Sequence, residues 1–158
     1  MNLVWRETRM ADADVLWRWA NDPETRRNSF NTSPILYEEH VAWLSQRLGS
    51  DATPIWIFSD GDVPVGQVRF DISGDVAEIG ITVAPEQRAR GYGRAMLDAA
   101  VRCLRAQRRD GVRPRASVLA HNQASLRLFK ACGFEEVGTV RRDSGEQVIL
   151  LELARVLS

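Results

Sequence analysis

The stretch Pro85–Leu97, PEQRARGYGRAML, places Gly91 and Gly93 directly before an apolar pattern that is typical of a helix. The first turn of a helix has N–H groups without helical acceptors and a partial positive charge, so it can hold an anion. Glycine lets an anion approach the backbone closely, and the three arginines of the stretch could add charge. The pattern favours a phosphate-binding turn, although an ordinary glycine-rich loop with a solvated basic face fits these residues equally well.

Two familiar phosphate motifs are excluded. Met96 stands where a G-x-G-x-x-G fingerprint requires a third glycine, and the chain contains no Gly-Lys-Ser or Gly-Lys-Thr of a P-loop. A different kind of phosphate site is therefore expected.

Outward from this stretch, the hydrophobic periodicity predicts strands and helices on both sides. Before it we expect a strand, two helices and three antiparallel strands, in Leu3–Thr8, Ala11–Asp22, Ser33–Gly49 and Pro54–Val83. Pro23 is expected to end the first helix, and the polar segment after it is expected to be a loop. After the helix that Gly91 opens, we expect a strand, a helix capped by Gly133 and a hairpin, in Arg115–Ala120, His121–Cys132 and Phe134–Leu153.

The strand that ends at Val83, the long helix and the strand Arg115–Ala120 form a crossover unit. Such units are right-handed and make their two strands parallel, so a mixed sheet is expected. A length of 158 residues suits a single domain that spans residues 1–158.

Charge and composition exclude several classes of protein. The 21 Lys and Arg residues balance 21 Asp and Glu residues, which argues against a nucleic-acid or membrane binder that relies on global charge. The first residues lack the apolar core of a signal peptide and no segment is long enough to cross a bilayer, so we expect a cytoplasmic protein. Cys103 and Cys132 lie in apolar, helical surroundings without metal-type spacing, so we expect buried, reduced thiols and no metal site. A homodimer is compatible with the sequence, which does not reveal the oligomeric state.

Two segments resemble a known family. Val83–Ala95 resembles the Q/R-x-x-G-x-G/A segment of the GNAT N-acetyltransferase superfamily, with Arg88, Gly91 and Gly93 at the defining positions. The stretch HNQASLRLFKACGF, His121–Phe134, is similar to the family's second acetyl-CoA segment, N-x-x-S/A-x-x-x-Y-x-x-x-G-F. Both segments occur in order, and the expected elements agree with that family over nearly the whole chain.

The resemblance implies an α/β fold of the GNAT type. This fold has a mixed, mostly antiparallel seven-stranded sheet flanked by four helices, with strands 4 and 5 parallel and splayed. It also implies acetyl-CoA as cosubstrate, with its pantetheine arm along strand 4 and its pyrophosphate on the amides of the glycine-rich turn. The residues implied in acetyl-CoA binding are Ile81, Thr82, Val83, Arg88, Ala89, Arg90, Gly91, Tyr92, Gly93, Arg94, Asn122 and Phe129.

The chain departs from the family at Phe129. The family usually has a tyrosine there, which donates a proton to the departing CoA thiolate, whereas phenylalanine has no donor. Water or another residue would protonate the sulfur instead, or the thiolate would leave without being protonated. Because a thiol has a pKa of about 8.5, loss of this acid need not stop the reaction. A core position for Phe129 fits its helical spacing from Leu126.

The acceptor should be an amine, which attacks the thioester only when unprotonated, so a base or a water chain must remove a proton. Glu78 is the first candidate, because strand alternation places it on the same face as Gly80 and Thr82. His40 and His121 are the other candidates, since histidine titrates near neutral pH. A surface charge or a satisfied polar group is the alternative interpretation for each of the three.

The region from Trp17 to Trp43 is expected to select the amine. Its aromatic side chains alternate with arginines, which suits a planar ring attached to phosphates, while Trp17 and Trp43 are also expected to pack in the core. The pattern W-x-N-D-P-E-x-R-x-x-S-F, followed by P-I-x-x-E-E-H-x-x-W, resembles acetyltransferases of bacterial nonulosonic-acid synthesis. Those enzymes acetylate the 4-amino group of a UDP-linked amino-deoxy sugar on the route to pseudaminic acid. The substrate contacts that this resemblance implies are Trp19, Asn21, Asp22, Arg26, Asn28, Ser29 and His40.

Two alternatives stay open. One is acetylation of a protein N-terminal amine, as in ribosomal-protein acetyltransferases, or of a polyamine, although the arginines of this region disfavour a polycation. The other is an acyl-CoA-binding module without catalytic activity, which the missing tyrosine permits.

Overall fold

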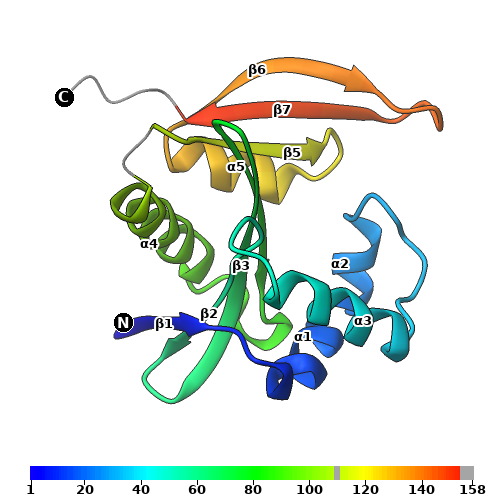
Figure 1. The fold of residues 1–158 in the computed structure, drawn as a ribbon. Helices are drawn as coiled ribbons and strands as arrows, with labels where there is room; N and C mark the ends of the chain where they lie inside the picture. Colours follow the sequence, from blue (N-terminus) through cyan, green and yellow to red (C-terminus); the bar gives the residue numbers. More distant parts are fainter. Residues whose placement is uncertain (109–110, 154–158) are drawn as a thin grey trace.

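In a computed structural model that describes residues 1–108 and 111–153, the chain folds into seven strands and five α-helices (Figure 1). The strands are β1 (Leu3–Glu7), β2 (Ile55–Asp60), β3 (Val63–Ser73), β4 (Val76–Val83), β5 (Arg113–Leu119), β6 (Phe134–Arg141) and β7 (Gln147–Leu153). The helices are α1 (Ala13–Ala20), α2 (Pro23–Arg27), α3 (Tyr37–Leu48), α4 (Tyr92–Gln107) and α5 (Gln123–Ala131), and short 3₁₀ turns at Met10–Asp12 and Pro85–Gln87 precede α1 and α4.

The seven strands form one sheet in the order β1-β2-β3-β4-β5-β7-β6. All neighbouring pairs are antiparallel except β4 and β5, which are parallel, so the predicted fold class is confirmed. The pairing of β4 with β5 covers only Val76–Glu78, whereas Ile79–Val83 pair with β3 alone. Beyond Glu78 the two parallel strands are therefore splayed, and one backbone edge of β4 has no neighbouring strand within residues 1–108 and 111–153.

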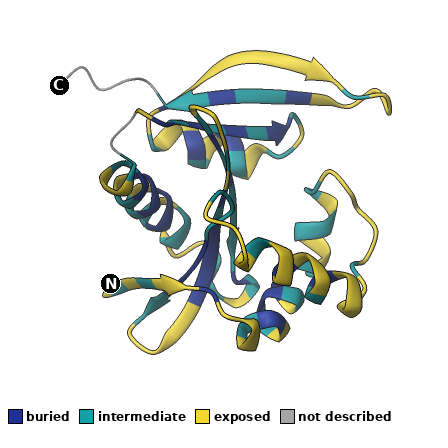
Figure 2. Cartoon of the chain, viewed as in Figure 1, coloured by how far each residue is buried: buried dark blue, intermediate teal, exposed yellow. Residues whose placement is uncertain are grey.

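Helix α4 covers one face of the sheet, because its apolar side chains recur on one stripe. Full burial of each large apolar side chain contributes roughly 1.5–3 kcal/mol, so this contact is a main source of stability. Figure 2 shows the buried stripe of α4 turned toward the central strands. The buried residues of the helix are Met96, Leu97, Ala100, Val101 and Leu104.

The three N-terminal helices cover the opposite face beside β3 and β4 (Figure 1). Trp19 of α1 and Leu44 of α3 are buried in a second apolar cluster with Ile55 and Ile57 of β2. The cluster also includes Ala84, the residue that follows β4. The sheet thus separates two layers, and the glycine-rich turn at the end of β4 lies between them.

Helix α2 contradicts the expectation that Pro23 begins a loop. Proline at the first helical position lacks only an N–H that would have no helical acceptor, and its fixed φ suits a helix. The Asp22 side chain caps this helix, accepting a hydrogen bond from the Thr25 amide at 3.2 Å. Pro23 therefore starts α2 rather than ending the helix before it, which stops at Ala20.

Other expectations concern single side chains. Trp17 is only partly buried and Trp43 is 37% exposed, so the prediction that both pack in the core is wrong for Trp43. Cys103 and Cys132 are free thiols, each partly rather than fully buried. Within the described ranges, no group of acidic, histidine or cysteine side chains is arranged to hold a metal ion. None of the helices in the same ranges has the length and apolar character needed to span a membrane.

Candidate active site

The turn between β4 and α4 presents a run of free backbone donors. Ala89 and Gly91 both have positive φ, 61° and 84°, and Gly91 is the N-cap of α4. Left-handed residues within a turn direct successive N–H groups toward one side and create a concave anion site. The N–H groups of residues 89–94 donate to no carbonyl or side chain in the described part of the protein. Seen from the backbone alone, the turn fits a pyrophosphate.

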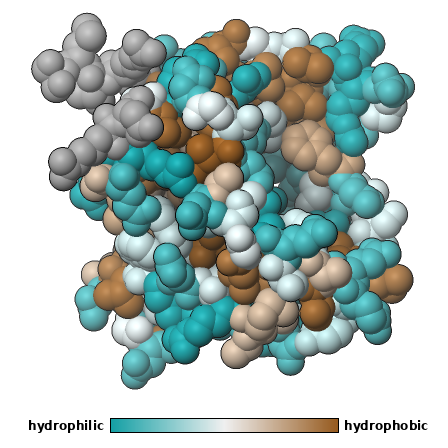
Figure 3. Space-filling view, viewed as in Figure 1, coloured by the Kyte–Doolittle hydropathy of each residue, from teal (hydrophilic) through white to brown (hydrophobic). Residues whose placement is uncertain are grey.

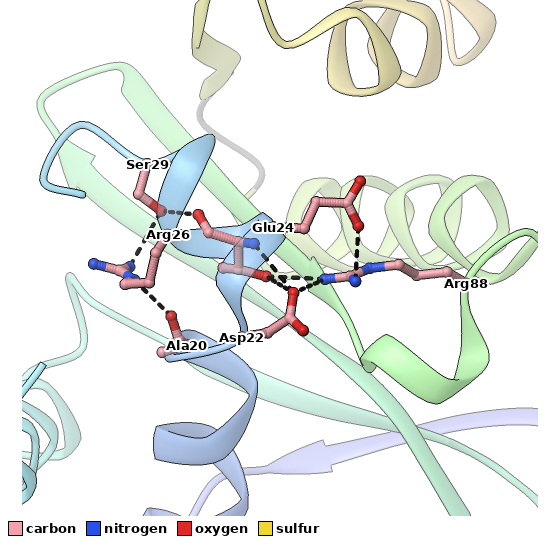
Figure 4. Close-up of polar contacts among 7 residues, drawn as sticks. Ala20, Asp22, Glu24, Arg26, Ser29 and Arg88 are labelled. Carbon is pink, nitrogen blue, oxygen red and sulfur yellow. Dashed lines mark hydrogen bonds and ion pairs between the residues drawn. The ribbon is translucent and has the colours of Figure 1, made fainter. Parts of the chain in front are cut away.

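Arg88 connects this turn to α2 (Figure 4). Its guanidinium contacts Asp22 at 2.5 Å and Glu24 at 2.8 Å, and donates to the Thr25 hydroxyl at 3.1 Å. Partial burial by itself would raise the pKa of Asp22, but the hydrogen bonds from Arg88 and the Thr25 amide outweigh it, and the pKa is lowered. Arg88 therefore joins the glycine-rich turn to α2 with its charge compensated by two carboxylates.

The other side chains of the turn differ in their surroundings. Tyr92 donates to the Asp60 carboxylate at 2.7 Å, which ties the start of α4 to the end of β2 and raises the pKa of the Tyr92 phenol. Arg90 donates to the Gln87 side chain at 3.2 Å, and Arg94 is exposed. Among the predicted acetyl-CoA residues, Tyr92 thus offers its backbone rather than its hydroxyl.

The splayed part of β4 has two different faces. Ile81 and Val83 pack against the α4 core, while Thr82 lies on the opposite face. Across the splay, Asn122 follows β5 and caps α5, where its Oδ1 accepts from the Ser125 amide at 3.3 Å. Phe129 is 3% exposed and meets Phe134 edge to face at 5.1 Å. The core position considered for Phe129 is therefore confirmed, and the missing phenol is replaced by apolar packing.

A cavity of about 360 Å³ lies between the N-terminal helices and the face of β3 and β4 that bears Thr82. In Figure 3, the surface is hollowed to the right of the centre, on the α1–α3 side of the sheet. We call this cavity the acceptor pocket. It is lined by Leu16, Trp19, Ala20, Thr25, Arg26, Ser29, Ile35, Glu39, His40, Trp43, Gln67, Arg69 and Thr82.

The acceptor pocket includes four of the seven predicted substrate contacts, namely Trp19, Arg26, Ser29 and His40. The other three are outside the lining. Asn21 hydrogen-bonds the backbone of Ile35 from both atoms of its amide, at 2.9 and 2.7 Å. Asp22 caps α2 and pairs with Arg88, and Asn28 is the C-cap residue of the same helix.

Arg26 is itself held in place. It donates to the Ala20 carbonyl at 2.7 Å and the Ser29 hydroxyl at 3.1 Å (Figure 4), and also to the Asn31 carbonyl at 2.8 Å. Much of its donor capacity is therefore used in shaping the loop after α2, which forms one wall of the pocket.

Several pocket residues were not predicted as substrate contacts, above all Gln67 and Arg69 of β3. In β3, strand alternation puts Gln67 and Arg69 on one face, opposite Gly66 and Val68. The ladder pairs Gln67 with Thr82 and Arg69 with Gly80. The same alternation that was applied to Glu78 could have found them, but it could not reveal that helices cover that face.

Two buried polar atoms of the acceptor pocket have no hydrogen-bond partner in the described structure. Gln67 donates from Nε2 to the Thr82 hydroxyl at 3.1 Å, while its Oε1 accepts no hydrogen bond. His40 is 4% exposed, and its Nε2 also has no partner among the described residues. Burial lowers the pKa of His40, despite an opposing backbone interaction with Ala13, so the ring is neutral near pH 7. A neutral imidazole whose free nitrogen is Nε2 can accept a proton or a hydrogen bond there.

The other predicted bases lie outside the lining of the acceptor pocket. Glu78 is on the same face of β4 as Gly80 and Thr82, as predicted, but at the end where β4 pairs with Arg115 of β5. His121 is exposed in the turn between β5 and α5. Of the three candidates, only His40 lines the pocket.

Comparison with known proteins identifies the family. The sequence profile of the acetyltransferase (GNAT) domain matches residues 2–135, most of the chain. The chain belongs to the GNAT acetyltransferase family. A search of curated proteins found no match.

Solved structures share the GNAT fold at low identity. Spermidine N-acetyltransferase from Vibrio cholerae, in complex with CoA and spermine, is 18% identical with a TM-score of 0.85, covering 96% of this chain and 95% of that one. AAC(6')-Ib, in complex with paromomycin and acetyl-CoA, is 18% identical with a TM-score of 0.84, covering 98% and 94%. A putative acetyltransferase from Salmonella typhimurium, with acetyl-CoA as its cofactor, is 21% identical with a TM-score of 0.74, covering 97% and 94%.

The GNAT assignment confirms that the protein is an N-acetyltransferase with acetyl-CoA as its cosubstrate. The resemblance to nucleotide-sugar acetyltransferases has no counterpart among these structures, two of which hold a polyamine or an aminoglycoside.

Proposed function

We propose that the protein transfers the acetyl group of acetyl-CoA to a primary amine of a small molecule held in the acceptor pocket. The observation that most supports this role is the pair of buried, unpartnered acceptors, Gln67 Oε1 and His40 Nε2, in a pocket that borders the splayed strand β4. Buried polar groups are rarely left without a partner, so an acceptor atom free in a pocket favours a ligand donor. An amine supplies such donors.

Acetyl-CoA supplies the activated acetyl thioester. In this proposal, the free N–H groups of residues 89–94 bind its pyrophosphate, and the unpaired edge of β4 from Ile81 to Val83 aligns the pantetheine arm. Asn122, at the opposite side of the splay, contacts the cosubstrate near that arm. Arg88 acts through its ion pairs with α2, which fix the turn relative to the helix that borders the acceptor pocket.

The amine must lose a proton before or during attack. We propose His40 as the base, because its lowered pKa leaves Nε2 unprotonated near pH 7 and its ring lines the pocket. Glu78 remains the second candidate, since it shares the β4 face with Thr82. Phe129 cannot protonate the departing CoA thiolate. Because the corresponding thiol has a pKa of about 8.5, the thiolate leaves readily without an acid.

Two classes of small-molecule amine are the main candidates for the acceptor. The sequence pattern of the first helices favours a UDP-linked amino sugar, whereas the solved structures with spermine or paromomycin favour a polyamine or an aminoglycoside. The comparisons support the second candidate better than the first. Protein N-terminal amines are a third class to include in any assay.

The test is release of CoA thiol from acetyl-CoA with a panel of UDP-amino sugars, polyamines, aminoglycosides and N-terminal peptides. Release that depends on one amine class, with the acetylated product seen by mass spectrometry, would support the proposal. Binding of acetyl-CoA without release for any amine would instead favour a non-catalytic acyl-CoA-binding module.

Two matched variants test the base. His40→Gln should lower kcat with the affinity for acetyl-CoA unchanged, because the amide cannot take the proton. Glu78→Gln should leave kcat near the wild-type value. The reverse result would assign the base to Glu78.

A further inference from the structure

The guanidinium group of Arg69 lies in space that the neighbouring strand leaves open at Gly80. Arg69 lies on β3 directly opposite Gly80 of β4, on the face that α1–α3 cover, and it lines the acceptor pocket. A Cβ atom at position 80 would lie 2.6 Å from Arg69 Cζ and 2.8 Å from Nε. The absence of a side chain at Gly80 therefore makes room for the guanidinium to lie across the neighbouring strand.

The Arg69 guanidinium has no hydrogen bond or ion pair with any residue of the ranges 1–108 and 111–153. The nearby arginines differ, because Arg47 pairs with Asp71 at 2.7 Å and Arg26 donates to backbone carbonyls. Burial lowers the pKa of Arg69, and the charges of Arg47 and Arg26 act in the same direction, with Asp71 opposing them. The Arg69 guanidinium is thus a charged group in a partly desolvated environment, with the positive charges of Arg47 and Arg26 nearby.

The rest of the pocket does not neutralise this charge. Among the described residues that line the pocket, Glu39 is the one carboxylate, and it is an exposed residue of α3. A partly buried guanidinium without a partner is unfavourable, and its planar fork suits the two oxygens of a carboxylate or a phosphate.

We propose that Arg69 binds an anionic group, a carboxylate or a phosphate, on the same small molecule whose amine is acetylated. This inference rests on the proposed function and names the class of its acceptor. Gly80 and Thr82 lie two residues apart on one face of β4, so the Arg69 fork and the Gln67–Thr82 pair are separated by about 7 Å along the strand. The acceptor is therefore an amine that carries an anionic group about 7 Å away. A polyamine offers no such group.

The test compares acceptors that differ only in the anionic group. One arm pairs short ω-amino carboxylates of graded length with the matching carboxamides. A second arm pairs phosphorylated amino alcohols and amino sugars with their unphosphorylated forms, and spermidine is the polycationic comparison. Each compound is assayed for CoA release, and for thermal stabilisation of the protein in the presence of CoA.

The variants separate the role of Arg69 from general loss of positive charge. Arg69→Gln removes the charge, and Gly80→Ala displaces the guanidinium while leaving the arginine in the chain. Arg27→Gln removes an equal charge from an exposed position of α2 outside the pocket lining and serves as the control.

In the wild type, we expect kcat/KM or affinity to be roughly tenfold or more higher for the anionic member of at least one pair, because its anion would form charged hydrogen bonds with Arg69. The arm in which this preference appears distinguishes a carboxylate from a phosphate. Arg69→Gln and Gly80→Ala should abolish the preference through KM, with the KM for acetyl-CoA unchanged, whereas Arg27→Gln should keep it.

The inference is overturned if the wild type shows no preference for an anionic member, or if the preference survives both Arg69→Gln and Gly80→Ala. Turnover of spermidine alone would overturn it and leave the proposed function standing. Conversely, an Arg69-dependent binding preference without CoA release from any amine would support anion binding by Arg69 but refute the proposed function, and with it the assignment of that anion to an acetylated amine.

Discussion

Replacing Gly91 by valine combines two effects that can be measured separately. Gly91 has a φ of 84°, which disfavours any residue with a Cβ atom and a β-branched residue most of all. Such strain costs about 1–3 kcal/mol. For a chain of this length, a loss of about 2 kcal/mol lowers the Tm by roughly 4–8 °C.

The second effect concerns acetyl-CoA. At a concentration of 100 times Kd, a ligand stabilises the folded protein by about 2.7 kcal/mol. If strain relief turns the N–H groups of the 89–94 turn away from their common side and weakens binding about 100-fold, the remaining stabilisation at the same concentration is about 0.4 kcal/mol. Gly91→Val should therefore lose most of the rise in Tm that acetyl-CoA gives the wild type.

The matched control is Gly145→Val in the β6–β7 turn. Gly145 has a φ of 90° and, like Gly91, no heavy atom within 4 Å of an added Cβ. It should lose a similar amount of stability in the absence of ligand and keep the full acetyl-CoA effect in differential scanning fluorimetry. If Gly91→Val retained the full ligand-induced rise in Tm, the turn would not be the pyrophosphate site.

Three further predictions concern charged and titrating groups. Arg88→Lys should lower the free energy of unfolding by about 1 kcal/mol in urea titrations, since one ammonium cannot keep both carboxylate contacts, and in an Asp22→Asn background the loss should shrink. Burial lowers the pKa of His40 below its usual 6.5, so near and below pH 6.5 the unfolded chain binds more protons than the folded protein, and the free energy of unfolding decreases as the pH is lowered. His40→Gln should therefore lose less of its free energy of unfolding than the wild type between pH 7 and pH 5, and equal losses would contradict this. Burial raises the pKa of the Cys132 thiol to about 12, so this cysteine should resist alkylation at pH 8 in the native protein, as followed by mass spectrometry, and rapid labelling would show that it is a reactive thiol.

The parts of the fold that follow from local pattern could be predicted from the sequence. Alternating apolar residues and turn glycines indicate the strands, and the crossover rule makes β4 and β5 parallel. The backbone of the glycine-rich turn was also predictable in part, because Gly91 before an apolar helix start permits the positive φ found there and leaves N–H groups without helical acceptors. Its role as the pyrophosphate site stays a prediction. Helix α2 was missed, because a proline that begins a helix looks like a proline that ends one unless the capping residue before it is considered.

The acceptor pocket was only half predictable, because it depends on contacts between distant segments. Gln67 and Arg69 have the pattern of polar residues on the solvent side of a strand, and they become pocket residues only because α1–α3 pack over them. Asn21 and Asp22 show the opposite case. Their side chains look available in the sequence but are used to fix the Ile35 backbone and to cap α2.

The most direct test of how this GNAT protein holds its cosubstrate is a titration of the ¹⁵N-labelled protein with CoA, followed by amide chemical shifts. We expect the largest shifts at the N–H groups of residues 89–94, which have no acceptor in the described structure, and at the splayed edge Ile81–Val83. Unchanged amides at 89–94, with the largest shifts instead beside Ala95, Asp98 and Arg102 on the outer side of α4, would contradict this placement.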